Sequence, residues 1–171
     1  MIEMKLVPED AEVLRQPCQE FDFANPPFDP KEFAENLYAT MKKHDGLGLS
    51  ANQVGYPYKV FAVRTDQAPL VIFNPRVVDT SDNIIPMKEG CLSFPLLYLN
   101  VKRPDKIRIR FQYYDGETTT KQFIGMSARV VQHEYDHMEG KVFLTKASSM
   151  ETQRALRKRM ILQRKVKSIK K

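Results

Sequence analysis

The chain has 171 residues, of which 42% are hydrophobic and 10% aromatic, enough for one compact domain or for one domain with a terminal extension. This composition excludes a collagen-like, repetitive or wholly disordered chain, and no apolar run approaches the roughly 20 residues that cross a bilayer. The net charge of +6 is uneven, because residues 154–171 hold nine of the 27 basic side chains and no acidic one. Residues 1–153 carry 18 basic against 21 acidic side chains, which argues against a nucleic-acid-binding core and for a partner contacted by the basic tail.

The first predicted helix begins at residue 30. Asp29 can cap it and Pro30 suits its first position, while Phe33, Leu37 and Met41 fall on one face. The stretch that follows, "GLGLSANQVG" at 46–55, is too rich in glycine for a regular element.

Strand signals dominate the middle of the chain. The runs "YKVFAVRT" (58–65) and "PLVIFNPRVV" (69–78) are typical of strands, although Pro75 interrupts the second. Residues 106–123 alternate apolar and polar side chains around Asp115 and Gly116, which predicts a hairpin.

Two helices are predicted after the hairpin. One begins near residue 127 and runs through "ARVVQHEYDHME", and the other begins at about residue 150, where Ser148 or Ser149 can cap it. On the last helix we expect three apolar residues to pack on the domain: Leu156, Met160 and Ile161. The pattern therefore predicts an α+β domain, with a mostly antiparallel sheet and the helix near residue 130 packed on it.

The stretch "QHEYDH" (132–137) contains the pattern H-E-x-x-H. On a helix His133 and His137 lie one turn apart on the same face, so both imidazoles can bind one metal ion. Glu134 stands beside that ion, where a carboxylate can take a proton from water. Met126 and Val130 continue the same face, either as ordinary core or as the wall of an apolar pocket.

A catalytic site of this kind needs a third ligand. In one large class of zinc proteases a histidine follows six residues after the second histidine, but Phe143 occupies that position here. Glu139 is too close along the helix, Glu151 begins the basic tail, and His44 is expected at the surface. Cys91, in "KEGCLSFP", remains, because a thiolate and two imidazoles bind Zn²⁺ or Fe²⁺ and leave a position for water.

The other cysteine, Cys18, has no histidine or acidic ligand pattern around it, and we interpret it as structural. So few cysteines are typical of a reducing compartment. The glycine before Cys91 and the proline soon after it predict a shaped loop there.

Three stretches together resemble the signature motifs of peptide deformylases: "GLGLSANQ" (46–53), "EGCLS" (89–93) and "QHEYDH" (132–137). Their order and intervals also match, so the resemblance covers about residues 1–148, while the basic tail at 149–171 transfers least. Ser50 departs from the family, which usually has alanine there, and we expect this change between small residues to matter little. The resemblance implies an α+β fold, with sheets around a central helix that carries the two histidines, followed by a C-terminal helix.

The resemblance also implies a metal-dependent hydrolase that removes the N-formyl group from the initiator methionine of new polypeptides and releases formate. Cys91, His133 and His137 would hold the metal, and Glu134 would carry the proton. Two donors would stabilise the oxyanion: the Gln53 side-chain amide and the Leu92 backbone N–H. The family's native ion is commonly Fe²⁺, while Zn²⁺, Ni²⁺ or Co²⁺ occupies the same site.

Substrate contacts follow from the same resemblance. Gly46 and Gly48 would let an extended N-formylmethionyl peptide approach the backbone. We expect an apolar slot for the methionine with walls formed by four residues: Leu47, Met87, Met126 and Val130. Glu89 either pairs with Arg103 to brace the Cys91 loop or forms a mere surface pair.

Partners and location complete the expectations. The basic tail is a candidate contact for the ribosome, whose surface is largely RNA phosphate, or it is a solvated helix that only aids solubility. We expect a monomer with no membrane association, in the cytoplasm, an organelle or the cytoplasm of a virus-infected host, because no targeting segment is visible. Two rivals stay open: a metallopeptidase acting on unformylated peptides, and a non-enzymatic binding module.

Overall fold

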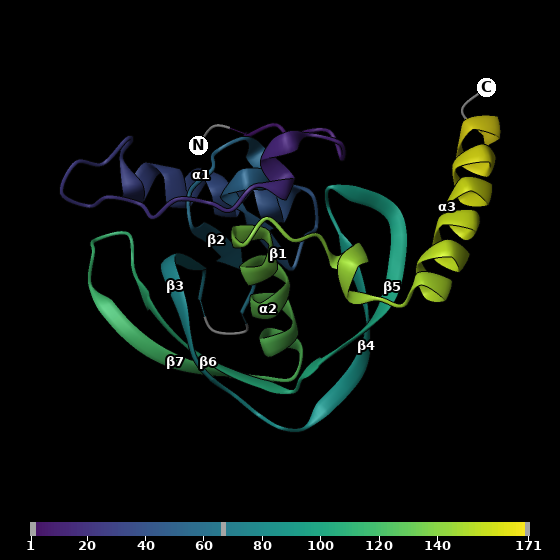
Figure 1. The fold of residues 1–171 in the computed structure, drawn as a ribbon. Helices are drawn as coiled ribbons and strands as arrows, with labels where there is room; N and C mark the ends of the chain where they lie inside the picture. The colour runs from purple at the N-terminus through teal and green to yellow at the C-terminus, as the bar shows by residue number, and fades with distance from the viewer. Residues whose placement is uncertain (1–2, 66–67, 170–171) are drawn as a thin grey trace.

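The computed structural model describes residues 3–65 and 68–169 and shows an α+β arrangement of antiparallel sheets and helices (Figure 1). Its α-helices are α1 (Pro30–Lys43), α2 (Met126–Met138) and α3 (Ser149–Ile169). Its strands are β1 (Gly48–Ser50), β2 (Val60–Val63), β3 (Leu70–Thr80), β4 (Ile84–Cys91), β5 (Phe94–Pro104), β6 (Lys106–Gln112) and β7 (Thr118–Ile124). Three short 3-10 helices complete the order: η1 (Glu12–Arg15), η2 (Ala51–Val54) and η3 (Phe143–Lys146). The predicted fold class is confirmed.

Five strands form an antiparallel sheet in the order β1-β2-β3-β6-β7. The predicted hairpin is present, since β6 pairs with β7 and Gly116 adopts a positive φ of 84° in the turn between them. We expected Pro75 to interrupt this strand, but β3 continues through it. A register shift between Phe73 and Arg76 takes the proline out of the hydrogen-bonded ladder.

A second, two-stranded sheet consists of β4 and β5. The expectation of a shaped loop around Cys91 was wrong, because only Leu92 and Ser93 separate the two strands and Cys91 pairs with Phe94. This hairpin therefore holds the cysteine at the end of a strand, in a two-residue turn.

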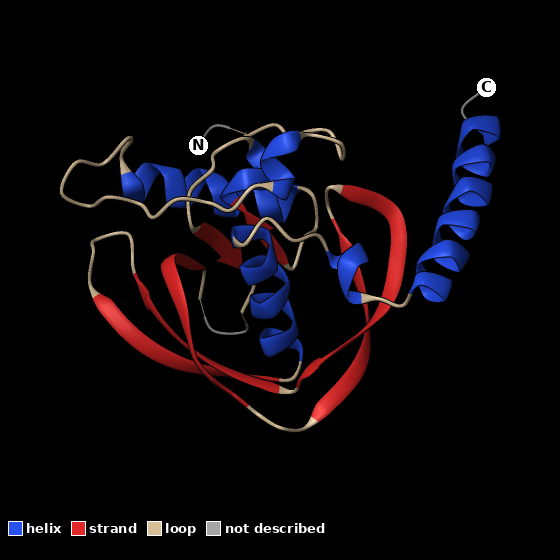
Figure 2. Ribbon diagram, viewed as in Figure 1, coloured by secondary structure: helices blue, strands red, loops and turns tan. Residues whose placement is uncertain are grey.

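Helix α2 lies between the two sheets (Figures 1 and 2). It contacts strands of the large sheet on one side and β5 on the other, and ten of its 13 residues are buried. Side chains along α2 are consequently removed from bulk water, which is the setting in which a metal site or a shifted pKa is expected.

Helix α1 begins as predicted. The Glu32 backbone N–H donates to Asp29 Oδ1 at 2.7 Å, and Phe33, Leu37 and Met41 are buried in the core. The glycine-rich stretch after α1 was not expected to be regular, yet it forms β1 and then η2, which is followed by its C-cap residue Gly55 with a φ of 87°.

Helix α3 begins as predicted, with the Glu151 N–H donating to Ser148 Oγ at 3.2 Å, but its packing was predicted wrongly. Leu156, Met160 and Ile161 are 37%, 53% and 55% exposed. The reason is that α3 contacts β5 through a different row, which includes Ala155 and Arg159, and then extends away from the body (Figure 1). The last two basic residues, Lys170 and Lys171, lie outside the described residues. None of the described helices is long and apolar enough to cross a membrane.

Candidate metal centre and active site

Three side chains that are far apart in sequence meet beside α2. His133 and His137 come from adjacent turns of α2 and Cys91 comes from the end of β4. Their ligand atoms lie within 4.8 Å of one another, and Cys91 Sγ is 3.4 Å from His137 Nε2. Tetrahedral coordination at the usual bond lengths separates a sulfur and a nitrogen ligand by about 3.5 Å. The donor set and its spacing thus fit a first-row divalent ion such as Zn²⁺ or Fe²⁺.

The alternative ligands weighed from the sequence are elsewhere. Within residues 3–65 and 68–169, these three side chains are the one group of His, Cys, Asp and Glu spaced to hold a metal. His44 is exposed at the end of α1, as expected. Cys18 is buried, and burial raises the pKa of its thiol to about 11, so it stays a neutral thiol at neutral pH.

Glu89 braces the first histidine from behind. Its Oε2 lies 3.0 Å from His133 Nδ1, and Arg103 donates to both carboxylate oxygens at 2.6 and 3.0 Å. Glu89 and Arg103 are both 5% exposed, so the alternative of a surface pair is wrong and the bracing pair is present. A carboxylate behind a metal-ligating imidazole fixes the ring and its tautomer, and it raises the ring's basicity.

The electrostatics of this cluster follow from its partners. Burial alone would raise the pKa of Glu89, but hydrogen bonds from His133 and Arg103, together with the positive charge of Arg103, outweigh it and lower this pKa to about 2. Burial alone would lower the pKa of His133, but contacts with Cys91 and Glu89 raise it to about 10. Surroundings that favour a proton on His133 also favour a metal cation held at its other nitrogen.

Glu134 has a distinct environment. Its side chain is buried, and burial raises the pKa of its carboxyl to about 7. Among the described residues none donates a hydrogen bond to Glu134 Oε2. A carboxyl group whose pKa is near neutrality, and one oxygen of which has no hydrogen bond to the described residues, is suited to take up and return a proton.

Gln53 is held beside Cys91 by a small network. Its Nε2 donates to Ser93 Oγ at 2.9 Å and lies 3.4 Å from Cys91 Sγ. Its Oε1 accepts from the Ser50 backbone N–H at 2.9 Å and lies 3.0 Å from Ser50 Oγ. The serine that departs from the usual alanine thus contacts the Gln53 side chain, a contact that the sequence did not indicate.

A cavity of about 290 Å³ opens beside these groups. Its walls include all the predicted site residues except Met87 and His137: Gly46, Leu47, Gly48, Gln53, Glu89, Cys91, Leu92, Met126, Val130, His133 and Glu134. Met87 is not among the lining residues; on β4 it lies two positions from Glu89, but further from the turn that holds Cys91.

Sequence reasoning missed part of this lining. Phe94, Leu97 and Tyr98 come from β5, and Lys88, Gly90, Asp45 and Arg129 also contribute. The sequence did contain a strand signal for β5: Leu97, Leu99 and Val101 are aliphatic residues at every second position, and in the structure they are buried while the residues between them are exposed. No comparable local signal marks Arg129, because its side chain is positioned by β4 and β5, whose carbonyls at Ile85 and Val101 accept its hydrogen bonds.

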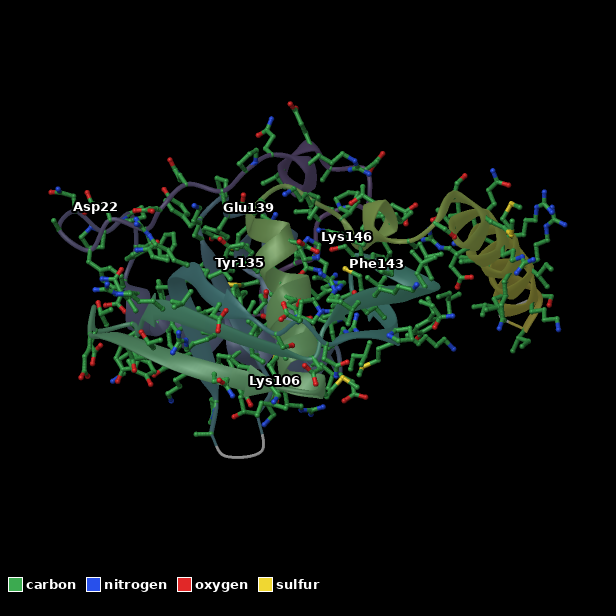
Figure 3. All side chains as sticks on the ribbon, turned by 60° about the horizontal axis from the view of Figure 1, so that its bottom comes forward. Asp22, Lys106, Tyr135, Glu139, Phe143 and Lys146 are labelled. Atoms are coloured by element: carbon green, nitrogen blue, oxygen red, sulfur yellow. The ribbon has the colours of Figure 1, made fainter. Side chains whose placement is uncertain are left out.

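Helix η3 packs on β5 beside α2. The Phe143 ring lies 5.5 Å from the His133 ring, and Lys146 Nζ lies 3.3 Å from Asp136 Oδ1; Figure 3 shows both residues next to α2. Phe143, which stands where one protease class has its third histidine, therefore packs against His133 and offers no ligand atom.

Comparisons with known proteins agree with one another. The sequence profile of the family "Polypeptide deformylase" matches residues 3–153. A peptide deformylase from Maricaulis maris is 38% identical over 135 residues, which are 76% of this chain and 78% of that protein. One from Thermotoga maritima is 32% identical over 139 residues, covering 81% of this chain and 80% of that protein.

Solved structures give the same result. The structure of a peptide deformylase from Synechococcus elongatus in complex with actinonin superposes with a TM-score of 0.85 at 30% identity, over 91% of this chain and 85% of that one. Peptide deformylase 1B from Arabidopsis thaliana superposes with a TM-score of 0.84 at 29% identity, over 96% of this chain and 93% of that one.

Proposed function

The chain belongs to the polypeptide deformylase family, and from that premise we propose how its residues carry out the reaction. It is a metal-dependent hydrolase that removes the N-formyl group from the initiator methionine of new polypeptides and releases formate. The observation that carries the assignment of residues is the meeting of Cys91, His133 and His137 beside the buried Glu134. The roles below rest on that geometry.

Cys91, His133 and His137 hold one divalent ion in this proposal. When bound, the ion acts as a Lewis acid that polarises the formyl carbonyl and makes water acidic enough to yield hydroxide near neutral pH. We propose Fe²⁺ as the native ion, and Zn²⁺, Ni²⁺ and Co²⁺ suit the same donors. Glu89 keeps the His133 ring oriented, and Arg103 keeps Glu89 ionised.

Glu134 moves the proton. It accepts the proton from the attacking water and later delivers it to the departing amine, for which a pKa near 7 is well matched. The Gln53 amide and the Leu92 backbone N–H donate to the oxyanion that forms from the formyl carbonyl. Support for the Gln53 role comes from its position: its Nε2 is held 3.4 Å from Cys91 Sγ, at the edge of the metal site.

The peptide lies along β1. This strand is at the edge of the large sheet, so its free side can pair with an extended peptide. At Gly48 an added Cβ would lie 2.3 Å from Glu134 Oε1, so only glycine lets the strand pass this close to the proton carrier. The methionine side chain enters the cavity between Leu47, Met126 and Val130.

Formate release decides between this reaction and its rivals. Protein prepared without oxygen is analysed for metal and incubated with formyl-Met-Ala, and we expect about one ion per chain and formate with Met-Ala as products. The matched variant Glu134→Gln keeps the shape of the site and the ligands, so it should bind metal normally while turnover falls by orders of magnitude. Cleavage of the Met-Ala bond would support the peptidase, and no reaction by metal-loaded protein would support the binding module.

We also propose a division of labour along the chain. Residues 1–148 form the catalytic part, and the basic helix at 149–171 holds the enzyme near the ribosome by electrostatic attraction to RNA phosphate. The support is the row of exposed lysines and arginines on α3, a helix that extends away from the body. A monomer in the cytoplasm, or in an organelle that makes its own proteins, is the setting this proposal requires.

A further inference from the structure

Arg129 is a buried cation in the wall of the substrate cavity. It lies on the same face of α2 as Met126, Val130 and His133, and like them it lines the cavity. Its residue is only 3% exposed. The reaction proposed above uses none of its atoms, so its presence beside the expected methionine slot needs its own explanation.

The guanidinium of Arg129 is fixed by three hydrogen bonds. Nη1 donates to Glu89 Oε1 and to the Val101 carbonyl, both at 2.8 Å, and Nη2 donates to the Ile85 carbonyl at 2.7 Å. Two of its five N–H groups, Nε–H and the second Nη2–H, have no acceptor among the residues that the structure describes. Because arginine does not lose its proton in proteins, the wall keeps a charged hydrogen-bond donor that is already oriented.

We propose that Arg129 is a specificity-determining residue of the methionine pocket. Because of Arg129, the enzyme also deformylates peptides whose first side chain has the length of methionine and carries a neutral hydrogen-bond acceptor near its end. Methionine sulfoxide, in which the thioether has gained one oxygen, is the side chain that fits this description. The inference rests on the proposed function, since it concerns the side chain of the same formylated residue. The chemistry of formyl removal is unchanged, because the sulfoxide oxygen takes no part in it.

The charge of the surroundings selects a neutral acceptor over an anionic one. Glu89 and Glu134 line the same cavity as Arg129, and Glu89 already offsets the arginine charge at 2.8 Å. A carboxylate entering the pocket would therefore face two carboxyl groups, whereas a sulfoxide oxygen would need only one of the two N–H groups that Arg129 has left. A purely apolar pocket would reject the sulfoxide, because a buried acceptor without a donor is strongly disfavoured.

Competing substrates test the idea. Formate release is measured for formyl-Met-Ala, formyl-norleucine-Ala and formyl-Met(sulfoxide)-Ala, and kcat/KM for the sulfoxide is divided by that for methionine. Arg129→Met removes the donor but keeps a side chain of similar length. Arg103→Met is the matched control, because Arg103 also bonds Glu89 but does not line the cavity.

We expect wild type to prefer methionine over its sulfoxide by less than about tenfold, and Arg129→Met to raise that preference by about tenfold or more. Arg103→Met should slow all three substrates together and leave the ratio near that of wild type. An unchanged ratio in Arg129→Met, or an equal shift in Arg103→Met, would overturn the proposal. If Arg129→Met does not fold, wild type alone decides, since a preference for methionine above about 100-fold is incompatible with a donor in the wall. No formate from formyl-Met-Ala would instead count against the proposed function.

Discussion

At the residue scale, Cys91 is the proposed metal ligand that the protein encloses least. It is half-buried, whereas His133 and His137 are 7% and 1% exposed. Its position is set by pairing with Phe94 across the turn and by the Gln53 amide 3.4 Å from its sulfur. A thiolate contributes a negative charge as well as a bond to the metal. The metal affinity of the site should therefore depend strongly on Cys91, although this residue is only half-buried.

Replacing Cys91 with serine should therefore lower metal occupancy and reduce kcat/KM by about 100-fold or more, since a neutral hydroxyl is a much poorer ligand than a thiolate. Elemental analysis and formate release measure the two effects. Cys18→Ala is the control for the loss of a thiol, because the Cys18 thiol is neutral, packs in a different hydrophobic cluster from Cys91 and contacts His137 only at its backbone carbonyl, at 3.9 Å. Full occupancy and full rate in Cys91→Ser would remove Cys91 from the ligand set.

Gly48 is a second residue at which a single atom should decide activity. A Cβ at this position would lie 2.3 Å from Glu134 Oε1 and 2.8 Å from its Cδ, so Gly48→Ala must displace the carboxylate or the strand. We expect kcat to fall by about 100-fold or more while metal content stays near one ion per chain.

Gly116→Ala provides the contrast to Gly48→Ala. Gly116 lies in the β6–β7 turn with a φ of 84°, and an added Cβ there would meet nothing closer than Phe23 at 3.7 Å. This variant should lose stability through backbone strain, by about 1 kcal/mol, and keep its turnover. A Gly48→Ala enzyme with nearly full kcat would show that Glu134 has room to move without losing its role.

At the element scale, local signals predicted the elements whose pattern is self-contained. The Asp29 cap, the Pro30 start and the 3.6-residue spacing of apolar residues located α1, and the Asp115–Gly116 turn located the β6–β7 hairpin. These features depend on neighbours in sequence, so the sequence alone contains the information.

The β4–β5 hairpin was missed because its local signals conflict. Three prolines and Gly90 disfavour regular strands, yet the alternation of Leu97 and Leu99 is typical of one. What stabilises the hairpin is tertiary: Arg103 and Arg129 connect β4 and β5 to each other and to α2 through Glu89. The sequence predicted that Cys91, His133 and His137 lie together, from spacing and resemblance. The buried ion pairs, by contrast, join residues up to 44 positions apart and leave no local pattern.

Helix α3 has one buried residue in its described part, Arg159, in addition to the contacts that Ala155 and Glu151 make with β5. Arg159 Nε donates to the Pro95 carbonyl at 3.0 Å, and Arg159 also pairs with Glu9. Pro95 follows directly on the turn that holds Cys91 and Leu92. Helix α3, which we propose contacts the ribosome, is thus bonded to β5 next to the turn that holds Cys91 and Leu92.

Arg159→Met should destabilise the protein by about 1–2 kcal/mol, because it removes two hydrogen bonds that involve a charged group. For a chain of this length the melting temperature should drop by about 2–8 °C, as thermal unfolding followed by circular dichroism would show. Lys158→Met is the matched control: Lys158 is the exposed neighbour, and its loss should change stability by less than about 0.5 kcal/mol. Equal melting temperatures for the two variants would mean that Arg159 does not fasten the helix.

At the scale of the whole molecule, the excess positive charge lies on the same part of the chain that extends from the body, helix α3. Residues 1–153 have a small negative net charge, and the excess of basic residues follows them. Six of these basic residues are exposed along α3: Arg154, Arg157, Lys158, Arg164, Lys165 and Lys167. Because α3 extends from the body (Figure 1), a large polyanion can reach this positive surface without covering the cavity beside α2.

Charge reversal tests the tail better than truncation, because cutting the helix would also remove Arg159. A variant with glutamate at four exposed positions keeps the anchor: Arg157, Lys158, Arg164 and Lys165. We expect its co-sedimentation with ribosomes at low salt to weaken by about tenfold or more, while formate release from formyl-Met-Ala stays within about threefold of wild type. Wild-type binding should itself fall at least about tenfold between roughly 50 and 200 mM salt, since each phosphate contact releases counterions.

The control carries the same change in net charge on the body, at four exposed lysines: Lys31, Lys42, Lys102 and Lys141. If the control loses as much binding as the tail variant, the attraction is a property of net charge and α3 has no special part in it.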